Sequence, residues 1–207
     1  MSASTAQERR ERQRGEARRT ILDAAGEIVM EEGAEAFSMR RLAARCGYTL
    51  PTIYHHFGDK PGLLETLLDE RFREMVNEIR KAVSPVDDPA ESLRRMLRAF
   101  IDFGLRNPRH YQLMISTLQE GDEPPAAEEA RELFEAPVLA LLDRGRLRAG
   151  DVEVGTQVIW AFAHGLISLL TSRADLEWAP DLLDVALDGM LHGVVIPDSA
   201  RSAEDAA

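Results

Sequence analysis

A short segment in the first third of the chain carries the side chains best suited to bind another molecule. Hydroxyl and imidazole groups gather there, on Thr49, Thr52, Tyr54, His55 and His56. Such groups hydrogen-bond to base edges and phosphates when a helix presents them outward. The two histidines do not predict a metal site, because adjacent helical residues point about 100° apart and no Cys, Asp or Glu completes a ligand set nearby. We therefore expect nucleic-acid contacts here, with no metal and no cofactor.

Two short helices and one tight turn are predicted to position these groups. Ser38 supplies an N-cap oxygen before a helix over 39–46, Gly47 allows a sharp turn, and Thr49 caps a second helix that ends near Phe57. The apolar residues expected to close a small shared core are Leu42, Ala43, Cys46, Ile53 and Phe57. The segment is thus predicted to be a helix-turn-helix whose second helix fits the major groove, about 12 Å wide.

The rest of the chain shows the same helical periodicity. Apolar residues recur every three or four positions, which predicts helices over 17–32, 60–81, 93–101, 111–118, 126–144, 151–173 and 180–195. Pro137 predicts a kink inside one of them. No alternating pattern of strand type is present. The predicted fold is all-α, with a flexible Arg-rich arm (1–15), a three-helix DNA-binding domain (16–60), a larger helical domain (61–196) and a disordered tail (197–207).

Charge is distributed unevenly along the chain. The total is 25 − 36 = −11, but residues 1–60 carry ten basic and nine acidic residues, and 61–207 carry fifteen and twenty-seven. Within 36–60 the balance is +3, from Arg40, Arg41, Arg45 and Lys60 against Asp59. A small cationic head on an acidic body is compatible with binding to DNA, which the total alone would argue against.

The larger helical part carries two further signals. Aromatic, thioether and imidazole side chains that are candidates for an apolar ligand pocket are Met96, Phe100, Phe103, Tyr111, Met114, Phe134, Trp160 and His164. Taken singly, such residues more often pack in a core. The helices over 151–173 and 180–195 are apolar on more than one face, which predicts a homodimer through a two-fold four-helix bundle.

The residues of the head resemble a known family. The series Ile21-Leu-Asp-Ala-Ala, Leu42-Ala, Gly47, Tyr54, His56-Phe57 and Lys60 with Leu63-Leu64 is similar to the amino-terminal domain of the TetR family of bacterial regulators. Trp160, His164 and Gly165 in an apolar helix resemble the WHG-type carboxy-terminal domain found in part of that family. The first match covers about residues 17 to 65 and the second is shorter.

The resemblance implies a transcription regulator that binds a palindromic operator as a dimer and is released by a small, largely apolar effector. Positions matching Tyr54, His56 and Lys60 usually touch phosphates in the family, and those matching 49–52 and His55 usually face bases. With Arg40, the implied DNA-binding set is Ser38, Met39, Arg40, Thr49, Leu50, Pro51, Thr52, Tyr54, His55, His56 and Lys60. Leu50 and Pro51 depart from the polar residue and Gly of many members, so a charged base contact is not expected there.

Other functions are disfavoured by the sequence. No phosphate loop, nucleophile elbow, H-E-x-x-H or Cys-His arrangement predicts an enzyme. A helical protein-interaction module remains the rival, and repressor and activator roles are not distinguished. The apolar stretch 158–170 is shorter than the roughly 18 residues of a membrane span, the six arginines near the start exclude a secretory signal, and the single Cys46 agrees with a reducing compartment. We expect a cytoplasmic protein without a membrane partner.

Overall fold

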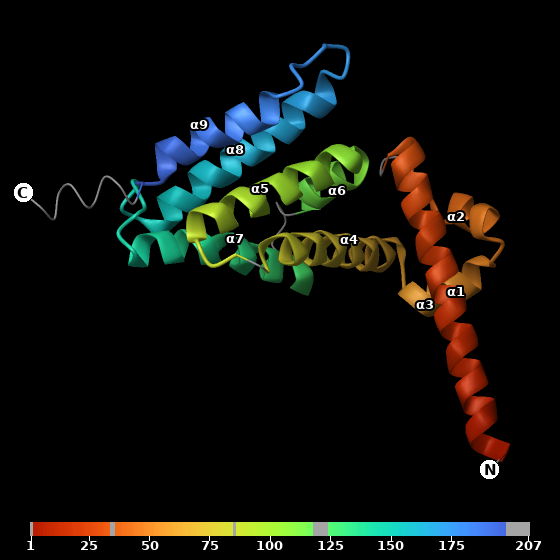
Figure 1. Cartoon of the computed structure of the whole chain (residues 1–207). Helices are drawn as coiled ribbons and strands as arrows, with labels where there is room; N and C mark the ends of the chain where they lie inside the picture. The colour runs from red at the N-terminus through yellow and green to blue at the C-terminus, as the bar shows by residue number, and fades with distance from the viewer. Residues whose placement is uncertain (1, 34–35, 85, 118–123, 198–207) are drawn as a thin grey trace, which may run out of the picture. The chain divides into compact units, whose positions relative to one another are not determined.

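The computed structural model describes residues 2–33, 36–84, 86–117 and 124–197. In this part of the chain all regular elements are helices, apart from one isolated bridge between Leu147 and Val195 (Figure 1). The helices are α1 (Ser2–Glu32), α2 (Met39–Cys46), α3 (Leu50–Phe57), α4 (Lys60–Val83), α5 (Pro89–Arg106), α6 (Pro108–Thr117), α7 (Pro125–Asp143), α8 (Val152–Ser172) and α9 (Leu182–Val194). The all-α prediction is confirmed.

The chain forms two compact units. The first comprises residues 1–71 and 109–124, and the second comprises 72–108 and 125–207. The division falls inside α4, which is one continuous helix that belongs to the first unit up to Arg71 and to the second from Phe72. Helix α6 belongs to the first unit although α5 and α7, its neighbours in sequence, belong to the second.

The first unit encloses a small apolar core. Buried residues come from α1, α2, α3 and α4, among them Ile21, Ile28, Leu42, Ile53 and Leu67. Helix α6 adds His110, which is buried, and a Cβ atom built on Gly26 of α1 would lie 3.7 Å from its Nε2 atom. The core therefore holds the two short helices against α1 and α4.

Helix α1 starts earlier than predicted. It begins at Ser2 rather than near residue 17, and its described side chains before Ile21 are mostly exposed. The sequence in this stretch lacks an apolar face, which is why periodicity did not predict a helix there. Pairs four residues apart, Gln7 with Glu11 and Arg12 with Glu16, connect successive turns.

The second unit is a bundle in which α5 is central. Helix α5 packs against α7, α8 and α9, and α8 also packs against α7 and α9. Its core contains Leu93, Leu97, Ile101, Val138, Ile159, Ala163 and Ile167. Gly104 of α5 lets α8 approach closely, because a Cβ atom there would lie 2.7 Å from the Cδ1 atom of Ile167. The bundle thus depends on a small residue at the crossing of α5 and α8.

An ion pair between a buried arginine and a half-buried aspartate joins the ends of this bundle. The Arg146 side chain is buried and donates to Asp88 Oδ1 at 2.6 Å and to the carbonyl oxygen of Ile196 at 3.2 Å. The loop after α7 is thereby joined to the start of α5 and to the segment after α9. Helix α7 runs through Pro137. The predicted tail lies, apart from Pro197, outside the described residues.

Candidate nucleic-acid interface

Local hydrogen bonds form the helix-turn-helix as the sequence predicts. Ser38 Oγ accepts from the backbone N–H of Arg41 at 3.3 Å, and Thr49 Oγ1 accepts from that of Thr52 at 3.4 Å. Gly47 has φ of 74° and its N–H donates to the carbonyl of Ala43 at 3.0 Å, which ends α2 in the left-handed conformation that favours glycine. The predicted N-caps and the turn are confirmed.

Tertiary contacts fix α2 and α3 in place. Leu42, Ile53 and Phe57 are buried as predicted, while Ala43 and Cys46 are half-buried. Two cations of α2 bind the end of α1: Arg41 pairs with Glu32 at 2.6 Å, and Arg45 pairs with Glu31 at 2.7 Å. The hydrogen bond and charge of Arg45 lower the pKa of Glu31. These arginines, counted above with the cationic head, act as structural links between helices.

Helix α3 exposes most of the predicted contact residues. Thr49, Pro51, Tyr54 and His55 are exposed, and Leu50, Thr52 and His56 are half-buried. The Tyr54 side chain is 44% exposed, so its phenol group is accessible on this face. Thr49 Oγ1 and Thr52 Oγ1 lie 2.9 Å apart, so the two hydroxyls orient each other. The exposed face of α3 is therefore a ready surface of hydroxyl, phenol and imidazole groups.

The surroundings of His56 disfavour its charged form. Burial lowers its pKa first, followed by the charges of His55, Arg14 and Arg18. A neutral imidazole both donates and accepts hydrogen bonds, whereas a cation only donates. The lowered pKa therefore favours the form of His56 that can both donate and accept a hydrogen bond.

Of three other predicted residues, Met39 and Lys60 are covered to different degrees and Arg40 is exposed. The Met39 side chain is buried, so only its backbone faces the surroundings. Lys60 Nζ donates to the Phe37 carbonyl at 2.9 Å and lies 5.6 Å from the centre of its ring. Arg40 is exposed and, within the described part of the chain, forms no ion pair. Among the four cations counted at 36–60, Arg41, Arg45 and Lys60 contact other parts of the first unit, and Arg40 shows no such ion pair within the described residues.

The predicted pocket residues are divided between the two units. Met96, Phe100, Phe103 and Phe134 are buried in the second unit, where Phe100 contacts Phe134 with ring centres 4.9 Å apart. The His164 ring lies between those of Phe100 and Trp160, at 5.3 and 4.4 Å, and burial lowers its pKa to about 4. Trp160 is 45% exposed. Tyr111 and Met114 are buried in the first unit.

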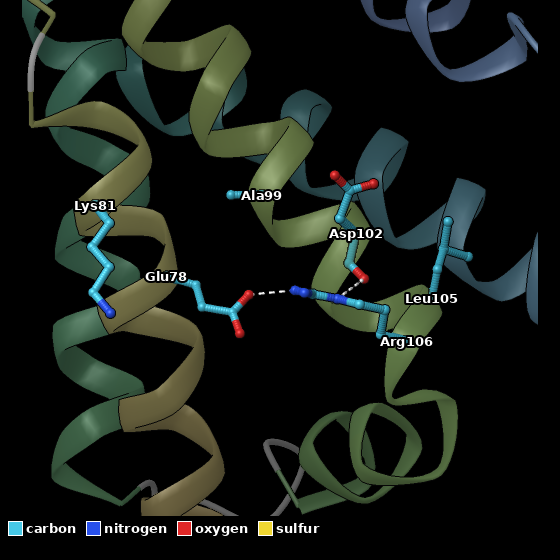
Figure 2. Close-up of a pocket in the computed structure, with 6 residues that line it drawn as sticks. All are labelled: Glu78, Lys81, Ala99, Asp102, Leu105 and Arg106. Carbon is cyan, nitrogen blue, oxygen red and sulfur yellow. Dashed lines mark hydrogen bonds and ion pairs between the residues drawn. The ribbon is translucent and has the colours of Figure 1, made fainter.

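A hollow of about 470 Å³ lies instead between α4 and α5 of the second unit (Figure 2). Its lining is Glu78, Lys81, Ala99, Asp102, Leu105 and Arg106. Arg106 pairs with Glu78 across it and donates from Nε to the Asp102 carbonyl at 3.2 Å. None of the predicted pocket residues lines it. The charged residues were missed because their sequence spacing is that of any solvated helix face, and only packing brings the two faces together.

The first unit contains a helix-turn-helix that has its own apolar core and an exposed second helix, and a helical bundle follows it in the chain. This combination is typical of a DNA-binding regulator of the helix-turn-helix class. Residues 21–67 match the family model "Bacterial regulatory proteins, tetR family", and residues 93–194 match "Tetracyclin repressor-like, C-terminal domain". The chain belongs to the TetR family, whose members are transcription regulators and not enzymes. The WHG-type assignment stays a prediction.

Curated relatives span nearly the whole chain. The transcriptional activator FasR of Mycolicibacterium smegmatis is 30% identical over 185 residues, covering 88% of this chain and 81% of its own. The transcriptional repressor KstR of the same organism is 26% identical, covering 83% and 85%. A TetR family transcription regulator from Marinobacter aquaeolei VT8 has the same fold, with a TM-score of 0.73, 19% identity and coverage of 90% and 100%.

Proposed function

We propose that this regulator is a repressor that binds a palindromic operator as a dimer, is released by a small effector and acts in the cytoplasm. The observation that supports DNA reading is the exposed face of α3, where Tyr54 and His55 stand free of the core. A helix placed in this way enters the major groove, and dimers read half-sites about 34–36 Å apart or a multiple of that.

The test is selection of bound fragments from a random duplex library with wild-type protein and the double variant Tyr54→Ala/His55→Ala. We expect one palindromic motif with the wild type and at least about tenfold weaker binding to it by the variant, because base contacts contribute roughly 1–3 kcal/mol each. Leu139→Ala, at an exposed position of α7, is the control and should bind as the wild type does. No enrichment at low salt would favour the protein-interaction module instead.

The dimer is supported by an apolar face on α8 and α9. Val154, Val158 and Leu169 of α8 and Val185 of α9 are between 48% and 60% exposed in the single chain. Helix α8 is long and apolar enough to cross a membrane by length and composition, with a mean hydropathy of 1.4, a property that the core helix of a soluble protein can share. We infer that a second copy covers this face and completes a four-helix bundle.

The effector is proposed to bind the second unit at the hollow between α4 and α5. Its volume is within the roughly 300–1,000 Å³ of small-molecule sites. Ala99 and Leu105 offer apolar contact, and Lys81, which forms no ion pair within the described residues, offers a cation. Because four of the six lining residues are charged, this lining fits a compound that carries a charged group beside an apolar part. The aromatic set around Phe100 and His164 is the alternative site.

Control of DNA binding would pass through α4. Glu78 and Lys81 line the hollow, and the same helix begins in the DNA-binding unit at Lys60. An effector that prefers one position of α4 lowers operator affinity, and the operator then lowers effector affinity by the same factor. Titrations of each in the presence of the other test this, and independent affinities would exclude it.

An activator is the second candidate, since one curated relative, at 30% identity, is named an activator. A reporter gene placed behind the selected operator separates the two. Repression gives higher expression when the regulator gene is deleted, and activation gives lower expression.

A further inference from the structure

The arginine-rich part of α1 presents one defined face to the side on which α3 lies. Residues four apart on a helix differ by about 40° in direction, so Arg10, Arg14 and Arg18 form one stripe along α1. Continued toward the C-terminus, the same face carries the fully buried Ile21, Ala25 and Ile28. The face that packs in the core of the first unit thus becomes cationic where the core ends.

Interactions with α3 fix the position of the C-terminal end of this stripe, at Arg18. The guanidinium carbon of Arg18 lies 5.2 Å from the centre of the Phe57 ring, at the end of α3. The charges of Arg14 and Arg18 both act on His56 of α3, contributing after burial and His55 to its lowered pKa. Figure 1 shows the N-terminal part of α1 extending past α3. The stripe therefore leads away from the proposed DNA-reading helix.

The arginines of α1 that form ion pairs lie off the stripe. Within the described residues, Arg10, Arg14 and Arg18 form no ion pair. Arg12 pairs with Glu16 at 3.8 Å, and Arg19 pairs with Asp23 and Glu70 at 3.0 Å each. Arg14 and Arg18, which interact with α3, thus lie on one face of α1 and form no ion pair within the described residues.

We propose that Arg10, Arg14 and Arg18 bind phosphates of duplex DNA beside the segment that α3 reads. This inference rests on the proposed DNA binding. From Arg18 to Arg10 the helix rises by about 12 Å, which corresponds to roughly three to four base pairs at 3.4 Å each. Because phosphate contacts are independent of base sequence, the stripe increases the affinity for DNA and the length of duplex covered. It does not change the base motif that α3 reads.

The experiment compares Arg10→Gln/Arg14→Gln with Arg9→Gln/Arg12→Gln, both in the full chain. The two variants lose the same charge on opposite sides of α1, and glutamine preserves helix propensity. Arg18 is left in place because it packs on Phe57. The probes are labelled duplexes carrying the selected palindrome, one with about six flanking base pairs at each end and one without flanks, titrated at several salt concentrations.

We expect the Arg10→Gln/Arg14→Gln variant to bind the flanked duplex more weakly and with less dependence on salt. Loss of four phosphate contacts per dimer lowers the slope of log K against log salt by about 3.6, so the wild type loses about 100-fold more affinity than the variant between 50 and 200 mM salt. The Arg9→Gln/Arg12→Gln variant should keep the wild-type slope, and the duplex without flanks should abolish the difference.

Equal slopes for the two variants on the flanked duplex would overturn the proposal. So would a stripe-dependent affinity for anionic phosphatidylglycerol vesicles with unchanged DNA binding, which would assign the stripe to a lipid surface. Failure of the underlying DNA function is separately visible, because the wild type would then show no selective binding to the palindrome.

Discussion

The pKa values of individual side chains in this regulator are shifted by burial at some positions and by ion pairs at others. His110 of α6 is buried beside Gly26 and Leu67, and burial, with the charge of Arg71, lowers its pKa to about 4. Arg45 has the opposite role on the surface, because its hydrogen bonds to Glu31 and Glu27 raise its own pKa and hold α2 to α1. A substitution of His110 therefore changes the cost of burying an imidazole, whereas a substitution of Arg45 removes hydrogen bonds at the surface.

The buried His110 makes stability depend on pH. The unfolded chain binds the imidazole proton near pH 6.5 and the folded chain only near pH 4, so its contribution is complete above pH 6.5 and falls as the pH drops toward 4. Between pH 7.5 and 5 this single group costs about 2 kcal/mol of unfolding free energy. We expect His110→Gln to remove that part of the pH dependence in urea titrations. His192→Gln, at an exposed position, should leave it unchanged, and an unaltered slope in His110→Gln would contradict the assignment.

At the scale of elements, helix caps and close crossings determine the packing. Ser38, Gly47 and Thr49 each act within their own turn. Replacing Ser38 by Ala removes the acceptor for the Arg41 N–H and is expected to reduce stability by about 1 kcal/mol. Chemical unfolding measures this, and Ser38→Asp, which restores an acceptor, should recover most of the loss.

The crossing of α5 and α8 leaves no room for a side chain at Gly104 of α5. A Cβ atom there would lie 2.7 Å from Ile167 Cδ1, so in Gly104→Ala either the Ile167 side chain or the helices must shift. We expect a loss of roughly 1–3 kcal/mol, although alanine is the better helix former. Gly15→Ala is the control, because a Cβ atom there meets nothing within 4 Å. A stability loss no larger than the control's would show that the crossing adjusts freely.

At the scale of the whole molecule, assembly should depend on the apolar face of α8 and α9. Val158 of α8 is 48% exposed, and Leu139 of α7, outside that face, is 45% exposed. We expect Val158→Glu to give a monomer and Leu139→Glu to remain dimeric, as measured by light scattering after size exclusion. Operator affinity should fall with Val158→Glu, since one head alone reads half a palindrome. A dimeric Val158→Glu would place the interface elsewhere.

The sequence by itself determined the features that arise from neighbours along the chain. The caps Ser38 and Thr49, the turn at Gly47 and the helical periods depend on residues a few positions apart, and the residues around Tyr54 identify the family. Tertiary structure alone decided which helix faces meet. It paired Arg45 with Glu31, brought Glu78 opposite Arg106, separated Tyr111 from Phe100 into different units and set Arg18 against Phe57. These contacts join residues distant in sequence, and periodicity fixes the buried face of a helix but not its neighbour.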